Sequence, residues 1–88
     1  MQEIKDGYGN SINQLGRTGL IYKTAHKEYF VDSEGLAGPE YGIALYPKSV
    51  KSLKGLERIN NLSDVEKEKI IKAIADLLTL NGIYVEII

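Results

Sequence analysis

The sequence predicts an α+β fold: a mainly antiparallel sheet of about four strands, one long C-terminal helix packed on one face, and a short helical turn near residues 48–53. Two aromatic and branched runs, at 19–23 and 28–32, predict a β-hairpin. A capped amphipathic segment that begins at Ser63 predicts the helix, and an apolar run after Gly82 predicts the last strand. The chain has 88 residues, which is the size of one domain.

The first sixteen residues are polar and contain three of the nine glycines. This composition predicts that residues 1–16 form a flexible arm or a short strand around Ile12. We therefore expect a single α+β domain over residues 17–88.

The two runs at 19–23 and 28–32 suggest their own pairing. The expected pairs are Lys23–Glu28, Tyr22–Tyr29, Ile21–Phe30 and Leu20–Val31. In this register opposite charges and two aromatic rings face each other, as cross-strand packing favours.

Glycine and proline divide the middle of the chain. Residues 33–40 contain both and are expected to form a loop. A third strand is expected over 42–46, ended by Pro47, which cannot donate to a sheet ladder. The helical turn near 48–53 should stay short because Gly55 is unfavourable in a longer helix.

The main helix carries the clearest local signals. Ser63 with Glu66 three residues later forms the pattern of a capping box. The buried stripe is expected to consist of apolar residues at helical spacing: Ile70, Ile71, Ile74, Leu77 and Leu78. The Asn81-Gly82 pair predicts the helix end, and residues 83–88 the final strand.

One helix can cover only one face of a sheet, because strand side chains alternate between the two faces. The uncovered face would mix aromatic, aliphatic and charged groups, which is typical of contact surfaces. We expect this face to bind a partner through Ile21, Phe30, Tyr46 and Tyr84, with Lys48 and Lys51 as charges at its rim. The alternative is that residues 1–16 or the segment 48–60 fold over it.

No catalytic or metal-binding pattern is present in the sequence. His26 is the only histidine and lies at the expected hairpin tip, where it has no evident partner for acid–base chemistry. Asp32, Glu34 and Glu40 surround a glycine-rich stretch, but their spacing is not that of a calcium loop. We expect no catalytic residue, no metal and no cofactor. An enzyme that used His26 and Glu34 would need a polar cleft joining the hairpin tip to the 33–40 loop.

Charge and hydropathy argue against several partner classes. The net charge is −1, from 11 basic and 12 acidic residues, whereas nucleic-acid binders depend on many cationic contacts to phosphate. No apolar run approaches the roughly 20 residues of a membrane span. The polar start lacks the apolar region of a secretory signal. We therefore expect a cytoplasmic protein with no nucleic-acid or membrane partner.

Several blocks of the sequence, in order, resemble the Imm74-type immunity proteins of bacterial polymorphic toxin systems. The blocks are Ser33-Glu34-Gly35-Leu36, then Ile43-Ala44-Leu45-Tyr46 with Ser49, Val50 and Leu53, then Ile70-Ile71 with Ile74, and finally Gly82-Ile83 with Val85-Glu86. The resemblance implies a small cytoplasmic α+β protein that neutralises a cognate toxin. Residues 53–56 depart from the family, which has a tryptophan followed by an acid and prolines in this stretch.

The function expected from these observations is non-catalytic binding: an immunity protein that occludes a cognate toxin protein. The alternative is a homodimeric structural or interaction module. Such a dimer would associate through the open sheet face or through an exposed edge strand.

Overall fold

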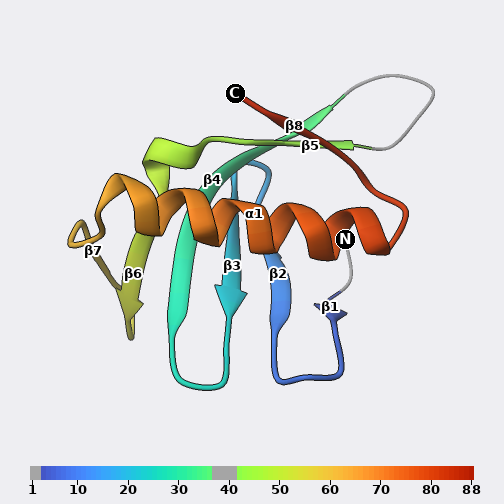
Figure 1. Ribbon diagram of the computed structural model, residues 1–88. Coiled ribbons are helices and arrows are strands. Elements are labelled where there is room, and N and C mark those ends of the chain that lie inside the picture. The colour runs from blue at the N-terminus through green and yellow to red at the C-terminus, as the bar shows by residue number, and fades with distance from the viewer. Residues whose placement is uncertain (1–2, 37–41) are drawn as a thin grey trace.

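The computed structural model describes residues 3–36 and 42–88, which form one sheet and one long helix (Figure 1). The elements in chain order are β1 (Ile4–Lys5), β2 (Ser11–Leu15), β3 (Gly19–Lys23), β4 (Glu28–Leu36), β5 (Gly42–Leu45), the 3₁₀ turn η1 (Pro47–Ser49), β6 (Lys51–Lys54), β7 (Glu57–Ile59), α1 (Asp64–Leu80) and β8 (Tyr84–Ile87).

The sheet is larger than the sequence predicts. Its described part has eight strands, in the order β1-β2-β3-β4-β5-β8, with β6 paired to both β4 and β7. All pairs are antiparallel except β5 with β8, so the sheet is mixed. The expectation of about four strands is therefore wrong, because the described part of the sheet has twice that number. The additional strands come from residues 4–15, expected to be an arm or a short strand, and from residues 51–59.

The hairpin of β3 and β4 has the predicted register. Lys23 faces Glu28, Tyr22 faces Tyr29, Ile21 faces Phe30 and Leu20 faces Val31. Lys23 Nζ lies 3.2 Å from Glu28 Oε1, and the two tyrosine rings stack with centroids 6.3 Å apart. Side-chain complementarity across the two strands was sufficient to predict this pairing.

Strand β4 continues to Leu36, so the expectation of a loop is wrong for residues 33–36. The remainder of that expected loop, residues 37–40, lies outside the described residues. Its first half pairs with β3 on one edge and with β6 on the other, whereas its second half pairs with β5. The last β4–β5 pair is Ser33–Leu45, and the first β4–β6 pair is Phe30–Lys51. Between these pairs β4 has two residues, Val31 and Asp32, whereas the facing chain has five, residues 46–50. Strands β5 and β6 are thus one long partner of β4, interrupted by a bulge that contains η1.

Ser49 closes this bulge. Its Oγ accepts a hydrogen bond from the Asp32 N–H (2.8 Å) and donates one to the Tyr46 carbonyl (2.6 Å). The Tyr46 N–H in turn donates to the Asp32 carbonyl at 3.2 Å. Both backbone groups of Asp32 are therefore satisfied where the strand ladder is broken.

The helical turn expected near 48–53 is confined to η1, and β6 begins at Lys51. Strands β6 and β7 form a tight hairpin in which Lys54 faces Glu57 across a two-residue loop. The first loop residue, Gly55, has φ +62°, and a glycine at this position is the signal of a type II′ hairpin turn. The glycine that argued against a long helix is thus the turn of a hairpin.

Helix α1 begins and ends as predicted. The Ser63 Oγ accepts from the Glu66 N–H, and the Glu66 carboxylate accepts from the Ser63 N–H, both at 3.1 Å. At the other end Gly82 has φ +78°, and the Ile83 N–H donates to the Leu78 carbonyl at 3.0 Å. This is the Schellman arrangement, which satisfies the last helical carbonyls.

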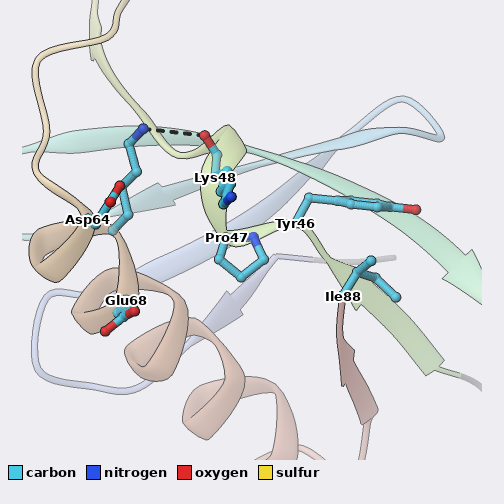
Figure 2. Close-up of a pocket in the computed structure, with 7 residues that line it drawn as sticks. Tyr46, Pro47, Lys48, Asp64, Glu68 and Ile88 are labelled. Atoms are coloured by element: carbon cyan, nitrogen blue, oxygen red, sulfur yellow. Dashed lines mark hydrogen bonds between the residues drawn. The ribbon is translucent and has the colours of Figure 1, made fainter.

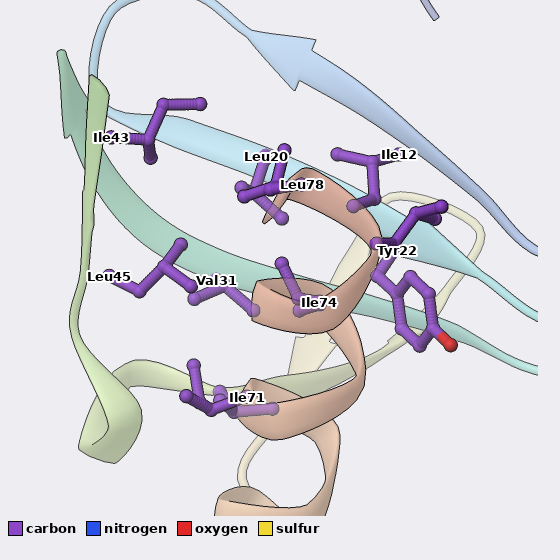
Figure 3. Close-up of a cluster of buried hydrophobic side chains, with 11 residues drawn as sticks. Ile12, Leu20, Tyr22, Val31, Ile43, Leu45, Ile71, Ile74 and Leu78 are labelled. Carbon is purple, nitrogen blue, oxygen red and sulfur yellow. The ribbon is translucent and has the colours of Figure 1, made fainter. Parts of the chain in front are cut away.

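The core lies between α1 and one face of the sheet, which we call the helix face (Figure 3). Its buried residues come from four strands, from the residue after η1 and from the helix: Ile12, Leu20, Tyr22, Val31, Ile43, Leu45, Val50, Ile71, Ile74, Leu77 and Leu78. The expected apolar stripe of the helix is thus confirmed: Ile71, Ile74, Leu77 and Leu78 are buried, and Ile70 is partly buried against the same cluster.

Candidate partner-binding surface

The face of the sheet opposite α1, which we call the outer face, divides into two ends. In Figure 1, α1 crosses in front of β2, β3, β4 and β6, and β5 and β8 lie above it. The strand registers place Ile21, Phe30, Lys51 and Arg58 on the outer face at one end. They place Glu34, Ala44, Tyr84 and Glu86 on the same face at the other.

Phe30 belongs to the first end, which we call the covered end. Its side chain is only 6% exposed. The guanidinium carbon of Arg58, on β7, lies 3.7 Å from the centre of the ring. Beneath the ring lies Gly19, where a Cβ atom would come within 2.7 Å of Phe30. Phe30 is thus buried by the chain's own hairpin, and the alternative that part of 48–60 folds over this face holds here.

Ile21 and Lys51, the other two predicted contact residues at this end, are half-buried. Ile21 pairs with Phe30 on β4, and Lys51 pairs with the same residue from the opposite side. The covered end therefore offers a partner little apolar area that the monomer does not already use.

The other end is open and acidic. The registers place Glu34, Ala44 and Glu86 side by side across β4, β5 and β8. Next to this row lie Asp32 and Tyr46, joined by a backbone hydrogen bond. We call the surface formed by these residues and by the neighbouring Tyr84 and Ile88 the acidic end: Asp32, Glu34, Ala44, Tyr46, Tyr84, Glu86 and Ile88.

The three carboxylates of the acidic end are exposed and form no ion pair with any described residue. The ion pairs in the described part of the chain join Lys5 to Glu3, Lys23 to Glu28 and Lys72 to Asp76. Arg17 lines the same shallow hollow as Glu34 without pairing with it. The net charge of the whole chain is only −1, but its three carboxylates make the acidic end locally negative.

Tyr46 reports the electrostatics of this end. Its Oη donates a hydrogen bond to Glu34 Oε2 at 2.8 Å. That bond raises the pKa of Tyr46 above the ordinary value of 10.0, and the charges of Asp32 and Glu86 act in the same direction. All three carboxylates are therefore close enough to act on one phenol.

Apolar groups lie among these charges. The Tyr84 side chain is 56% exposed and that of Ile88 is 63% exposed. Ala44, between Glu34 and Glu86, is only 2% exposed, so the larger side chains around it form the surface. Exposed apolar groups with polar neighbours are typical of a contact site.

A cavity of about 360 Å³ adjoins the acidic end where η1 meets the start of α1 (Figure 2). Its lining residues are Tyr46, Pro47, Lys48, Asp64, Lys67, Glu68 and Ile88. Lys67 Nζ donates to the Lys48 carbonyl at 3.3 Å, which ties the helix to η1. Lys48 itself is exposed, at the border of the acidic end. The cavity contains charged and apolar groups, but no histidine, serine or cysteine.

His26 and Glu34 do not share a site. His26 lines a hollow at the tip of the β3–β4 hairpin, and Glu34 is not among its lining residues. Glu28 begins β4 beside that tip, and Glu34 is six positions further along the extended strand, which is a distance of about 20 Å. Within the described ranges, no group of three histidine, cysteine or acidic side chains could hold a metal ion.

The structure thus brings Tyr46 and Tyr84 together on the acidic end, with Lys48 at its border, and places Ile21, Phe30 and Lys51 on the covered end. Sequence reasoning missed Asp32, Glu34 and Glu86 as members of one surface. It considered the first two together with Glu40, around a glycine-rich stretch, and their alignment with Glu86 follows only from the β4–β5–β8 pairing.

Comparison with known proteins gives no match: no family model, no curated protein and no solved structure is similar to this chain. Over residues 3–36 and 42–88, no helix is long and apolar enough to cross a membrane.

Proposed function

We propose that this protein is a non-catalytic binding protein that acts in the bacterial cytoplasm and neutralises a partner protein by occluding it. The type of partner follows the sequence resemblance to immunity proteins: a cognate toxin. The acidic end, rather than the whole outer face, is the surface that makes the contact.

One observation carries this proposal: the acidic end combines exposed apolar groups with three carboxylates that no described residue neutralises. Tyr84 and Ile88 supply apolar area, and Tyr46 adds an aromatic ring whose hydroxyl is held by Glu34. Tyrosine at such a site gives area at low entropic cost, and charged neighbours give orientation.

The sign of the charge suggests the chemistry of the partner. A negative surface attracts a positively charged one and accelerates association, most strongly at low salt. The partner surface should therefore be basic. Lys48, at the border of the acidic end, would lie at the edge of such a contact.

The proposal is tested by co-expression with the protein encoded next to this gene. That neighbour should inhibit growth of a bacterial host, and this protein should restore growth and co-purify with it as a complex. An inactive neighbour, or a toxic one that this protein neither binds nor inhibits, would show that the proposal is wrong.

A pair of triple variants tests the surface. The combination Asp32→Asn, Glu34→Gln and Glu86→Gln should weaken the complex by about tenfold or more at low salt. The matched control, Glu3→Gln, Glu57→Gln and Asp76→Asn, removes the same charge from exposed positions elsewhere and should change affinity little. An equal loss of affinity in both variants would show that the effect comes from the net charge of the protein and not from the acidic end.

A further inference from the structure

Strand β8 has one edge without a partner among the described residues. The Ile88 N–H donates to the Leu45 carbonyl at 3.0 Å, so the backbone groups of Ile88 point toward β5. Those of Glu86 and Tyr84 do the same, because backbone groups alternate along a strand. The N–H and C=O groups of Val85 and Ile87 therefore point away from the sheet.

This edge lacks the usual protection. Natural edge strands are commonly shielded by lysine, proline, a bulge or a very short length. Strand β1, at the far end of the sheet, has only two residues. Strand β8 has four, contains neither lysine nor proline, and carries exposed apolar side chains at Tyr84 and Ile87. Its single charge is Glu86.

We propose that β8 binds an extended segment of the partner protein as an additional strand, with a lysine or arginine of that segment opposite Glu86. This inference rests on the proposed function and specifies how the partner docks. The outward N–H and C=O groups of Val85 and Ile87 supply backbone hydrogen bonds, and alternate side chains supply specificity.

The basic residue follows from the row of side chains across the outer face. Glu86 lies two strands from Glu34, which is about 10 Å, and only Ala44 stands between them. A cation on an added strand would lie next to Glu86 and extend this row. The positions two residues before and after the cation would face Tyr84 and Ile88. Its immediate neighbours would lie on the helix face and would face Val85 and Ile87, so all four positions should be apolar or β-branched.

A second copy of this chain suits the edge less well. In antiparallel self-pairing, outward-pointing residues must face each other, so the two-fold axis would pass through Val85, Glu86 or Ile87. These registers place Glu86 opposite Tyr84, Glu86 or Ile88 of the second copy. None offers a cation, and each joins two acidic ends into one sheet, where like charges repel.

Short peptides test the docking mode directly. The probe is the capped pentapeptide Thr-Val-Arg-Val-Thr, and its matched control is Thr-Val-Glu-Val-Thr. Amide NMR titration should place the perturbed residues on β8, and the arginine peptide should bind about fivefold tighter. Glu86→Lys, an exposed substitution, should reverse this preference.

The backbone contribution is separable from the side-chain contribution. When the probe pairs antiparallel to β8, the amides of both valines face β8 and the amide of arginine faces away. N-methylation of both valines should therefore abolish binding, and N-methylation of the arginine amide should not. Ile87→Pro removes an outward N–H without removing a β5–β8 hydrogen bond, so it should block the probe, whereas Ile87→Thr should not. If the probe binds equally well after N-methylation of its valines and to the Ile87→Pro variant, the proposal is overturned.

The outcomes separate the docking mode from the function. A toxin that is neutralised equally by the parent protein and by Ile87→Pro would reject strand addition and leave the proposed function intact. If the probe binds β8 in the expected register but the protein neutralises no toxin, strand addition at β8 is supported and the proposed function is rejected. If sedimentation shows that the parent protein is a dimer and that the Ile87→Pro variant is a monomer, the edge of β8 binds a second copy of the chain, and the proposal is overturned.

Discussion

The two ends of the outer face use similar residues in different ways. At the covered end an aromatic ring, Phe30, lies beneath the Arg58 guanidinium and above Gly19. At the acidic end an aromatic ring, Tyr84, lies over Gly42 and has no described element above it. The first arrangement stabilises the fold, and the second leaves apolar area available to a partner.

The difference arises from how the sheet continues beyond each strand. Strand β6 turns back through Gly55 into β7, which brings Arg58 across the outer face. Strand β8 has no such neighbour among the described residues, since its pairing partner is β5 alone. A sheet with one helix therefore has its second face only half covered, by a hairpin of three- and four-residue strands.

The largest expected effect separates the two aromatic residues. Phe30→Ala should lower the free energy of unfolding by about 3 kcal/mol, because it removes a buried ring and leaves a cavity. Tyr84→Ala should cost less than about 1 kcal/mol, because its ring is more than half exposed. Urea denaturation followed by circular dichroism measures both values. Equal losses would contradict the division into a covered and an open end.

A smaller effect is expected where the two ends meet. Ser49→Ala removes the hydroxyl that bridges Asp32 and Tyr46 in the bulge and leaves the Asp32 N–H without its partner. The expected loss is about 1 kcal/mol of unfolding free energy.

Ser52→Ala provides the matched control for this serine. Its Oγ also donates one hydrogen bond, to Asn61 Oδ1 at 2.8 Å, but both groups can turn to water. The expected change is a few tenths of a kcal/mol. If Ser49→Ala proves as mild as Ser52→Ala, the bulge does not depend on its side-chain bridge.

The smallest effect is a shift in titration at the acidic end. The Glu34 carboxylate raises the pKa of Tyr46 in the folded protein. The protonated phenol therefore contributes stability below pH 10.0, and that contribution is lost as the pH rises through the raised folded pKa. Glu34→Gln should move the pKa of Tyr46 back toward its ordinary value.

The phenolate absorbance of Tyr46 can be isolated by subtracting the titration of Tyr46→Phe from that of the parent protein. The same subtraction in the Glu34→Gln background gives the shifted value. Glu57→Gln, which removes a distant carboxylate, should leave the titration unchanged. An unchanged pKa in Glu34→Gln would mean that the hydrogen bond between the two side chains does not form in solution.

Local signals in the sequence were reliable where each residue interacts with near neighbours. The capping box at Ser63 and the glycine at position 82 set the ends of α1 through contacts within a few residues. The β3–β4 register followed from complementary side chains in adjacent segments. These features required no knowledge of the rest of the fold.

Non-local pairing was the source of the errors. Residues 33–36 look like a loop because glycine is poor in an isolated strand, yet β5 supplies the ladder that holds them in β4. Gly55 was recognised as a helix breaker but not as a hairpin turn, since glycine is both unfavourable inside a helix and favoured in a two-residue hairpin loop. Strands β6 and β7 were missed because Gly55 was assigned the wrong role, and β1 and β2 were missed because residues 1–16 are polar and contain three glycines.

By itself the sequence determined the helix, its ends, the central hairpin and the face that α1 covers, because those features depend on capping, spacing and alternation along the chain. Only the tertiary structure decided that Phe30 is buried under Arg58 and that Glu34 and Glu86 share one surface. The physical reason is strand pairing: hydrogen bonds between distant segments determine which side chains become neighbours, and no local pattern encodes that choice.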